Sequence, residues 1–275
     1  MKERNVGFLG PKGTYTEAAA QQVFPGQNLI PYRDVTAILT AVSAGEIHHG
    51  ILPIENLLEG TVLPVLDGLT SFPELKIQGE TLIRIEHHLL VKPGMKKEEL
   101  TAVFSHTQAL AQCRNYLREE LPHLPCQAMS STAEAARRVA FDLHTCGAIG
   151  NRKAAEIYGL EVLDDNISDA PENTTRFIVI GLEIPPPTGK DKTSLVLSLE
   201  HQPGSLSQLL ILFAREGINL TKIESRPSRK VMGEYIFYLD FEGHITDERI
   251  QKVIKEAENY VTSLSIMGSY PRAGS

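Results

Sequence analysis

The chain has 275 residues, of which 42% are hydrophobic and 22% are charged, and its formal net charge is -7. These values are typical of a globular protein of one or two domains and exclude the low-complexity and disordered classes. Because binding to phosphate groups needs a basic face, the acidic balance argues against a nucleic-acid partner and favours a small-molecule ligand.

Signals for a membrane, a disulfide framework or a metal are weak. No uncharged apolar stretch approaches the ~18 residues of a membrane helix, and the first residues lead into a strand-like run, so we expect a cytoplasmic protein. Cys113, Cys126 and Cys146 lack CxxC spacing, which argues against disulfides and a zinc site. Neighbouring histidines, as in His48-His49 and His87-His88, point to opposite faces of a strand, so we predict no metal.

Short apolar runs alternate with helix-patterned segments along the first two thirds of the chain. We expect strands at residues 6–9, 29–32, 50–54, 81–91, 102–104, 126–129, 147–149 and 176–180, and helices at 16–24, 35–44, 108–120 and 133–143. This alternation predicts an α/β fold with largely parallel sheets covered by helices.

Three consecutive prolines, Pro185 to Pro187, mark a boundary because proline neither donates to a ladder nor continues a helix. We therefore predict a first domain over residues 1–181, a linker over 182–191 and a second domain over 192–275. In the second domain we expect strands at 193–199, 220–224, 235–241 and 264–267, and helices at 205–216 and 247–260. This βαββαβ order predicts a ferredoxin-like fold. Each helix has one apolar face, made by Leu206, Leu209, Leu210 and Phe213 and by Ile250, Val253, Ile254 and Ala257.

The loop Gly10-Pro11-Lys12-Gly13-Thr14-Tyr15 follows the first predicted strand and opens the first helix. Open α/β sheets present ligands to backbone donors and to a positive helix end at such a place. It is not a Walker loop, because the GK[ST] ending is missing and Pro11 lacks an N–H group. A bound carboxylate and a plain strand-to-helix turn both explain it.

Polar residues also follow other predicted strands. Asn56 has an amide that can donate to a substrate oxygen, whereas Glu55 would repel an anion unless it meets a hydroxyl or organises nearby donors. Ser105 suits a helix cap and an anion contact equally well, and His106 suits an acid or a merely hydrogen-bonded side chain. Arg176 can fork onto a carboxylate, although the threonines before it are also what a strand prefers.

Six short motifs occur together and in one order: Gly10-Pro11-Lys12-Gly13-Thr14-Tyr15-Thr16, Pro53-Ile54-Glu55-Asn56, Ser105-His106-Thr107-Gln108, Ser131-Thr132-Ala133, Ala148-Ile149-Gly150-Asn151 and Asn173-Thr174-Thr175-Arg176-Phe177. Over residues 5 to about 181 they resemble the prephenate dehydratases. With the motifs Pro203-Gly204-Ser205-Leu206 and Glu224-Ser225-Arg226-Pro227, residues 192 to about 271 resemble an ACT regulatory domain. The resemblance implies a two-lobed, periplasmic-binding-protein-like catalytic domain followed by the βαββαβ ACT domain.

Two residues depart from the pattern of this family. Leu57 stands where the family usually has Ser or Thr, so a hydroxyl able to contact substrate is missing, and we assign no role to Leu57. Thr107 replaces a proline, which changes a backbone restriction and no functional group.

The resemblance implies conversion of prephenate to phenylpyruvate with loss of carbon dioxide and water, and no cofactor. It assigns Thr175 to the departing hydroxyl, where we interpret its side chain as a positioned donor, and we hypothesise that His106 relays a proton to it. We expect Arg176, Glu55 and Asn56 to complete the catalytic residues. The predicted substrate contacts are Thr14, Tyr15, Ser105, Gln108, Thr174 and Phe177.

For the second domain, the resemblance implies inhibition by L-phenylalanine. The predicted effector residues lie in Pro203-Gly204-Ser205-Leu206 and Glu224-Ser225-Arg226-Pro227, the two motifs that form the phenylalanine site in this family. We expect inhibition through closure of the two lobes, and a homodimer or homotetramer formed through ACT domains.

Two other functions remain open from the sequence. An arogenate dehydratase would perform the same chemistry on a substrate with an amino group in place of the ketone. A non-catalytic amino-acid sensor would leave the catalytic residues idle, and the intact pair Thr175-Arg176 argues against it.

Overall fold

The computed structural model describes residues 4–142, 145–228 and 234–274, which form two compact units. The first unit consists of Met1–Ile38, Ile51–Val62 and Leu82–Phe177, and the second of Leu39–Gly50, Leu63–Thr81 and Ile178–Ser275. Each unit is therefore assembled from three stretches of chain. The predicted domain limits at residues 181 and 192 stay a prediction. No helix among the described residues is long and apolar enough to span a membrane.

The chain passes between the units within four elements: α2 (Val35–Ser43), β3 (His49–Asn56), β5 (Lys76–Arg84) and β11 (Thr174–Gly181). The first unit also contains β1 (Asn5–Leu9), α1 (Tyr15–Val23), β2 (Asn28–Tyr32), β4 (Gly60–Thr61), β6 (His88–Val91), η1 (Lys97–Glu99), β7 (Ala102–His106), α4 (Thr107–Gln112), α5 (Arg114–Glu120), β8 (Cys126–Met129), α6 (Thr132–Phe141), β9 (Cys146–Gly150), α7 (Arg152–Tyr158) and β10 (Glu161–Asp164).

The first unit contains a five-stranded sheet in the order β10-β6-β9-β7-β8. Strand β7 is parallel to β8 and β9, and β1 is parallel to β2, as predicted. Strand β6, however, is antiparallel to β9 and β10, so the sheet is mixed. Hydrophobic periodicity marks a strand without giving its direction, which is why the prediction of largely parallel sheets was incomplete.

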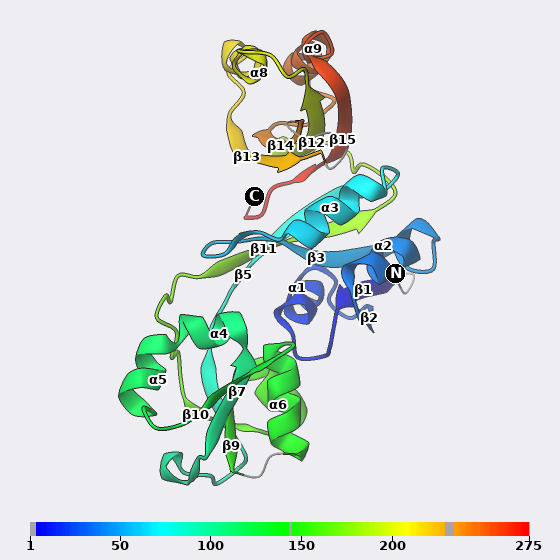
Figure 1. Cartoon of the computed structure of the whole chain (residues 1–275). Helices are drawn as coiled ribbons and strands as arrows, with labels where there is room; N and C mark the ends of the chain where they lie inside the picture. The colour runs from blue at the N-terminus through cyan, green and yellow to red at the C-terminus, as the bar shows by residue number, and fades with distance from the viewer. Residues whose placement is uncertain (1–3, 143–144, 229–233, 275) are drawn as a thin grey trace. The chain divides into compact units, whose positions relative to one another are not determined.

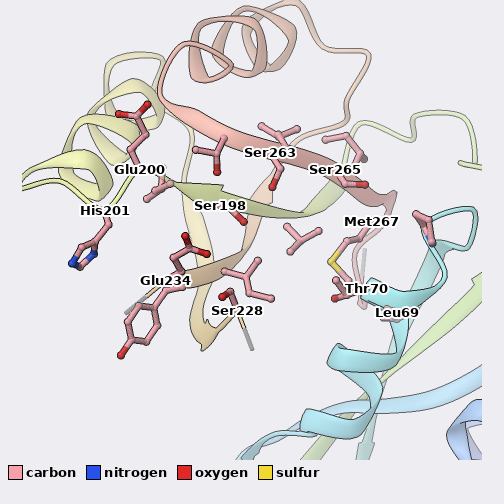
Figure 2. A pocket seen from close by; sticks show the side chains of 18 of the residues that line it. Leu69, Thr70, Ser198, Glu200, His201, Ser228, Glu234, Ser263, Ser265 and Met267 are labelled. Atoms are coloured by element: carbon pink, nitrogen blue, oxygen red, sulfur yellow. The ribbon is translucent and has the colours of Figure 1, made fainter. Parts of the chain in front are cut away.

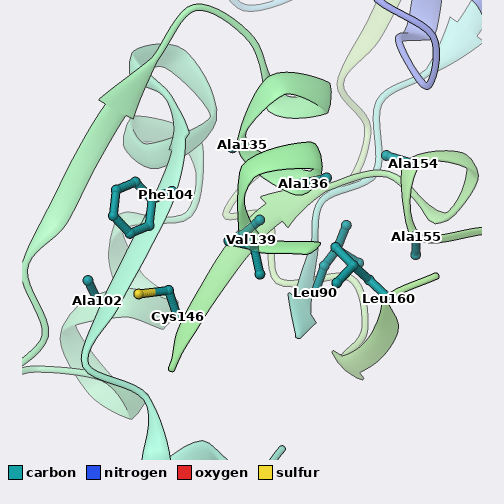
Figure 3. Packing of buried hydrophobic residues seen from close by; sticks show 11 residues of the cluster. Leu90, Ala102, Phe104, Ala135, Ala136, Val139, Cys146, Ala154, Ala155 and Leu160 are labelled. Atoms are coloured by element: carbon teal, nitrogen blue, oxygen red, sulfur yellow. The ribbon is translucent and has the colours of Figure 1, made fainter. Parts of the chain in front are cut away.

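Helix α6 shows how small residues bring a helix close to this sheet. Ser131 caps it by accepting the N–H of Glu134 at 3.0 Å. Its buried face consists of Ala133, Ala135, Ala136 and Val139. Figure 3 shows side chains of α6, α7 and the strands β6, β7 and β9 gathered in one apolar cluster. The opposite face of α6 is polar, with Arg137 paired to Glu134 at 2.8 Å.

In the first unit, one predicted strand and one predicted helix are each divided into two elements. The predicted strand 81–91 ends at Arg84 and resumes at His88. In the gap, the N–H of Ile85 donates to the carbonyl of Asn173 at 2.8 Å. The predicted helix 108–120 breaks at Cys113 into α4 and α5. Asp169 causes this break: its N–H donates to the carbonyl of Gln112 at 2.7 Å, and its carboxylate accepts the N–H of Asn115 at 3.2 Å.

The second unit contains α3 (Leu63–Ser71), β12 (Asp191–Leu199), α8 (Ser205–Arg215), β13 (Leu220–Pro227), β14 (Tyr235–Glu242), α9 (Glu248–Ala257) and β15 (Val261–Pro271). The strand order is β13-β14-β12-β15, all antiparallel, and β15 also pairs with β5. The predicted βαββαβ order is thus confirmed.

Helices α8 and α9 cover one face of this sheet (Figure 1). Phe213 from α8 and Ile250 from α9 share a buried cluster with Phe241 of β14. On α8 the buried face is centred on Leu209, Leu212 and Phe213, so Leu212 belongs to it although the predicted face omitted it. The apolar faces of both helices confirm that they pack on a single sheet.

Candidate active site and effector motifs

One polar contact in the first unit joins Asn56, at the end of β3, to Thr175, at the start of β11. The side-chain Nδ2 of Asn56 donates to Oγ1 of Thr175 at 2.8 Å. The Oδ1 of Asn56 accepts the N–H groups of Leu58 and Glu59 at 3.0 and 3.1 Å, which fixes the orientation of the amide. Because the oxygen of Thr175 accepts this bond, its own hydrogen is available to donate. Thr175 is 8% exposed, so such a donor is well shielded from water.

The neighbouring pair along the same two strands is Glu55 and Arg176. Nη1 of Arg176 lies 3.4 Å from Oε2 of Glu55. Arg176 is buried, whereas Glu55 is partly exposed. Pairing with Glu55 holds the guanidinium group at the strand end and neutralises it there. The structure thus brings together all four of the predicted residues Glu55, Asn56, Thr175 and Arg176.

The loop between β1 and α1 is held by internal hydrogen bonds. The N–H of Gly13 donates to the carboxylate of Glu17 at 2.5 Å, and the carbonyl of Gly13 accepts Nδ2 of Asn151 at 3.0 Å. Gly13 has φ of 85°, and a Cβ atom here would lie 3.2 Å from Cα of Ala154. The carboxylate of Glu17 therefore lies at the N-terminal, positive end of α1. This is the place where the sequence left open the binding of a ligand carboxylate.

Thr14 and Tyr15, both predicted substrate contacts, also serve this loop. Thr14 caps α1 by accepting the N–H of Glu17, and its hydroxyl donates to the carbonyl of Leu9 at 3.1 Å. The hydroxyl of Tyr15 donates to the carbonyl of Glu86. Burial raises the pKa of Tyr15 well above its ordinary value, so this phenol stays protonated.

The predicted residues around α4 occupy different environments. Ser105 is fully buried, and its hydroxyl donates to the carbonyl of Ile149 at 2.7 Å. His106, not Ser105, caps α4, because its Nδ1 accepts the N–H of Gln108 at 3.4 Å. The side chain of Gln108 is exposed. Within the described residues, no hydrogen bond joins His106 to Thr175, so the proton relay through His106 stays a hypothesis.

The remaining predicted contacts lie on β11. The hydroxyl of Thr174 donates to the carbonyl of Glu172 at 3.2 Å, and the carbonyl of Thr174 accepts the N–H of Leu57 at 2.9 Å. Phe177 is 2% exposed and belongs to the core. Leu57 is 65% exposed, so the position where the family has a hydroxyl faces outward in this chain.

Gln112 contacts the candidate site, and no sequence pattern pointed to it. Its Oε1 accepts Nδ2 of Asn173 at 3.1 Å and lies 3.0 Å from Nε2 of His87, while its Nε2 donates to Oε1 of Glu59 at 3.3 Å. Gln112 thereby joins the turn after Asn56 to the residue before Thr174. It follows the predicted Gln108 by four positions on one helix, which places both on the same face, but a lone glutamine carries no chemical signature.

The predicted effector residues lie in the second unit. Gly204 has φ of 89° and precedes the first residue of α8, Ser205, and Leu206 is partly buried. Strand β13 carries the other motif, and its residues alternate between partly buried and exposed. Nη2 of Arg226 lies 3.4 Å from the carboxylate of Asp67 on α3.

A pocket of about 660 Å³ lies in the same unit (Figure 2). Leu69 and Thr70 of α3 line it together with serines of β12 and β15, including Ser198 and Ser265. Glu200 lies close in sequence to the first effector motif and also lines the pocket. None of the predicted effector residues is among the described residues that line it.

Comparisons with known proteins agree with this arrangement. The prephenate dehydratase family model matches residues 6–184, and the ACT domain model matches residues 193–259. A prephenate dehydratase of Methanocaldococcus jannaschii is 40% identical over 270 residues, which cover 95% of this chain and 96% of that protein. An arogenate dehydratase of Petunia hybrida is 40% identical over 283 residues, which cover 97% of this chain and 71% of that protein.

A solved structure adds the fold. The prephenate dehydratase of Arthrobacter aurescens, in complex with L-Phe, matches with a TM-score of 0.90 and 38% identity over 98% of this chain and 90% of that chain. The α/β fold class with a C-terminal ACT domain is therefore confirmed. The first family match also includes both strand ends that carry the Asn56–Thr175 bond. The chain belongs to the prephenate dehydratase family.

Proposed function

We propose that this chain converts prephenate to phenylpyruvate, carbon dioxide and water at the ends of β3 and β11, and that L-phenylalanine bound to its ACT domain inhibits the reaction. The observation that carries the proposal is the 2.8 Å hydrogen bond from Asn56 to Thr175. This bond leaves a buried threonine hydroxyl oriented as a donor at the position where the family resemblance assigns the departing hydroxyl.

The reaction breaks two bonds and forms an aromatic ring. The bond between the ring and its carboxylate breaks to release carbon dioxide, and its electron pair enters the ring as the C4 hydroxyl leaves. The leaving hydroxyl takes up one proton and departs as water. Thr175 stabilises the developing charge on this oxygen by a hydrogen bond, which is strongest in the transition state and hence accelerates the step.

The paired charges of Glu55 and Arg176 have a separate role. Arg176 offers several N–H donors in a planar group, which suits the carboxylate of the pyruvyl side chain. Its contact with Glu55 at 3.4 Å keeps the guanidinium group in place before substrate binds. Thr14, Tyr15, Ser105, Gln108, Thr174 and Phe177 remain predicted contacts, and the structure shows that several of them also stabilise the loops around the site.

Regulation is proposed for the ACT domain. Gly204, Ser205 and Leu206 surround the N-terminal end of α8, where N–H groups and the helix dipole favour the carboxylate of an amino acid. Residues 224–227 supply the second motif on β13. The related structure from Arthrobacter aurescens contains L-Phe, which supports the same effector here. A homodimer or homotetramer through the ACT domain and a cytoplasmic location remain predictions.

An arogenate dehydratase is the second candidate, favoured by the relative from Petunia hybrida. The two substrates differ by an amino group in place of a ketone, so a mismatched buried donor or acceptor would discriminate them strongly. The ratio of kcat/KM for prephenate and arogenate decides between them.

The test of the main proposal is direct. Purified protein is mixed with prephenate, and phenylpyruvate is quantified for the wild type, for Thr175→Ala and for the matched control Thr36→Ala, an exposed threonine of α2. We expect turnover by the wild type and the control and its collapse in Thr175→Ala. A folded wild type without activity on either substrate would favour the non-catalytic sensor.

A further inference from the structure

His87 is a buried polar side chain that the proposed mechanism does not use. It directly precedes β6 and is 3% exposed. Nε2 of its ring lies 3.0 Å from Oε1 of Gln112. The other ring nitrogen, Nδ1, is buried and has no hydrogen-bond partner among the described residues. Tyr15 lies edge-on to the ring, with centroids 6.4 Å apart.

The hydrogen-bond network fixes where the proton of His87 lies. Because Glu59 offers a carboxylate oxygen, the group of Gln112 that faces it must be the NH₂. The group that faces His87 and Asn173 is then the oxygen Oε1, which only accepts. His87 must donate to it, so the ring carries its proton on Nε2. Burial lowers the pKa of His87, which keeps the ring neutral near pH 7.

This network connects the two segments that hold the catalytic residues. Glu59 belongs to the turn that the amide oxygen of Asn56 organises. Asn173 directly precedes Thr174 and Thr175, and its carbonyl accepts the N–H of Ile85 at 2.8 Å. Gln112 is hydrogen-bonded to Glu59 in the first segment and to Asn173 in the second. The position of its amide therefore affects the distance between Asn56 and Thr175. Without the donor of His87, Gln112 would lose one of the two bonds that hold its oxygen.

We propose that His87 is a positioning residue for the dehydratase reaction: its Nε2–H group holds the amide of Gln112, and Gln112 aligns the turn after Asn56 with the start of β11. This inference rests on the proposed function. It assigns to His87 no contact with the reacting atoms and no proton transfer. A misplacement of about 1 Å in such a support is enough to lower the rate roughly 100-fold.

Two substitutions separate this role from others. Glutamine places its NH₂ near the position of Nε2, so His87→Gln keeps the donor, whereas the shorter asparagine in His87→Asn places its amide near Nδ1. We expect kcat/KM to fall ~100-fold in His87→Asn and to stay within a few-fold of the wild type in His87→Gln. The shape of the pH profile of kcat/KM should be the same in all three proteins. Equal losses in both variants, or the disappearance of one limb of the pH profile, would overturn the proposal.

A double-mutant cycle tests the route through Gln112. If His87 acts through this amide, His87→Asn should cost little more in a protein that already carries Gln112→Ala. Losses that multiply would show that His87 acts independently and would sink the proposal. Circular dichroism of every variant ensures that the comparison is made between folded proteins.

A spectroscopic measurement is independent of activity. In protein labelled with ¹⁵N-histidine, the ring of His87, assigned by its loss in His87→Gln, should give the spectrum of the Nε2–H tautomer. An Nδ1–H tautomer overturns the proposal even if the enzyme is active. An inactive wild type with the Nε2–H tautomer overturns the proposed function and leaves the hydrogen-bond placement intact, so the two failures are distinguishable.

Discussion

The proposed catalytic residues of the first unit and the predicted effector motifs of the second are built in different ways. Asn56 and Thr175 are 119 positions apart in sequence, yet a direct hydrogen bond joins them. The effector motifs lie at the N-terminal end of α8 and along β13, the outermost strand of its sheet, where every second residue is exposed.

This difference indicates what each site needs in order to work. A catalytic site gains rate from groups that are already oriented before substrate arrives, because no energy is then spent on ordering them during the reaction. A regulatory site must respond to its ligand, and groups at a helix end and an outer strand are available to an amino acid or to a second subunit.

Loss of the Thr175 hydroxyl should have the largest effect. Thr175→Ala removes the shielded donor that we propose for the leaving oxygen, and we expect kcat to fall by about 10²–10³-fold. Thr175→Ser keeps the hydroxyl and should retain most of the activity. The formation of phenylpyruvate measures both. If serine were as poor as alanine, the methyl group and not the donor would matter, and the catalytic half of the comparison would fail.

The amide of Asn56 should come next. Asn56→Asp keeps the oxygen that accepts the N–H groups of Leu58 and Glu59 but loses the donor to Thr175. Because a bond to an ordered oxygen is lost and a negative charge is added, we expect kcat to fall roughly 10–100-fold, which corresponds to ~1.4–2.7 kcal/mol. Asn28→Asp, which alters the amide of an exposed contact to Asn5, is the matched control and should have wild-type activity. Equal values of kcat in Asn56→Asp and Asn28→Asp would contradict the idea that the hydrogen bond between Asn56 and Thr175 prepares the site for the reaction.

Asp67 should affect regulation and leave basal activity unchanged. The ion pair between Asp67 and Arg226 links α3 to the effector strand β13, and both side chains are mostly buried. Asp67→Asn weakens this link, so we expect the L-phenylalanine concentration for half-maximal inhibition to rise roughly 5–10-fold, within the usual range of allosteric coupling. Asp142→Asn breaks an exposed pair with Arg138 in the first unit and is the control. An unchanged response to L-phenylalanine in Asp67→Asn would show that α3 does not carry the coupling.

Local patterns in the sequence predicted most of the elements in both units. They missed α3, because Gly68 opposes helix formation, Pro64 in the first turn suits a loop as well as a helix start, and the rest of this segment is too apolar to show one face. They also missed the short helix α7 and the strand β10, which consist of seven and four residues. The break at Cys113 was not predictable from its neighbours, because Asp169 causes it from a distant loop.

Selecting the proposed catalytic residues required more than local sequence patterns. Their positions at strand ends alone did not show whether Asn56 and Arg176 have a functional or only a structural role. The family resemblance identified them as candidate catalytic residues. No sequence pattern showed that Gln112 joins His87, Asn173 and Glu59, because hydrogen bonds between distant segments leave no periodic trace. It is therefore easier to identify the proposed catalytic groups from sequence than to identify the groups that hold them in place.

The smallest expected effect concerns stability and pH, and it tests the buried network of the first unit. Burial lowers the pKa of His87 in the folded protein, whereas in the unfolded chain it titrates near its ordinary value of about 6.5. Between these two values the unfolded chain binds more protons, so the contribution of His87 to stability is present above about pH 6.5 and is lost as the pH falls toward the lowered value.

His87→Gln removes this titration, so the free energy of unfolding should fall less steeply between about pH 7.5 and about pH 5.5 in the variant than in the wild type. Urea unfolding at both pH values measures the difference. Some slope should remain, because burial also lowers the pKa of His88. His123→Gln, at an exposed histidine, should keep the wild-type slope. If His87→Gln kept that slope as well, burial would not keep the ring of His87 neutral in the folded protein.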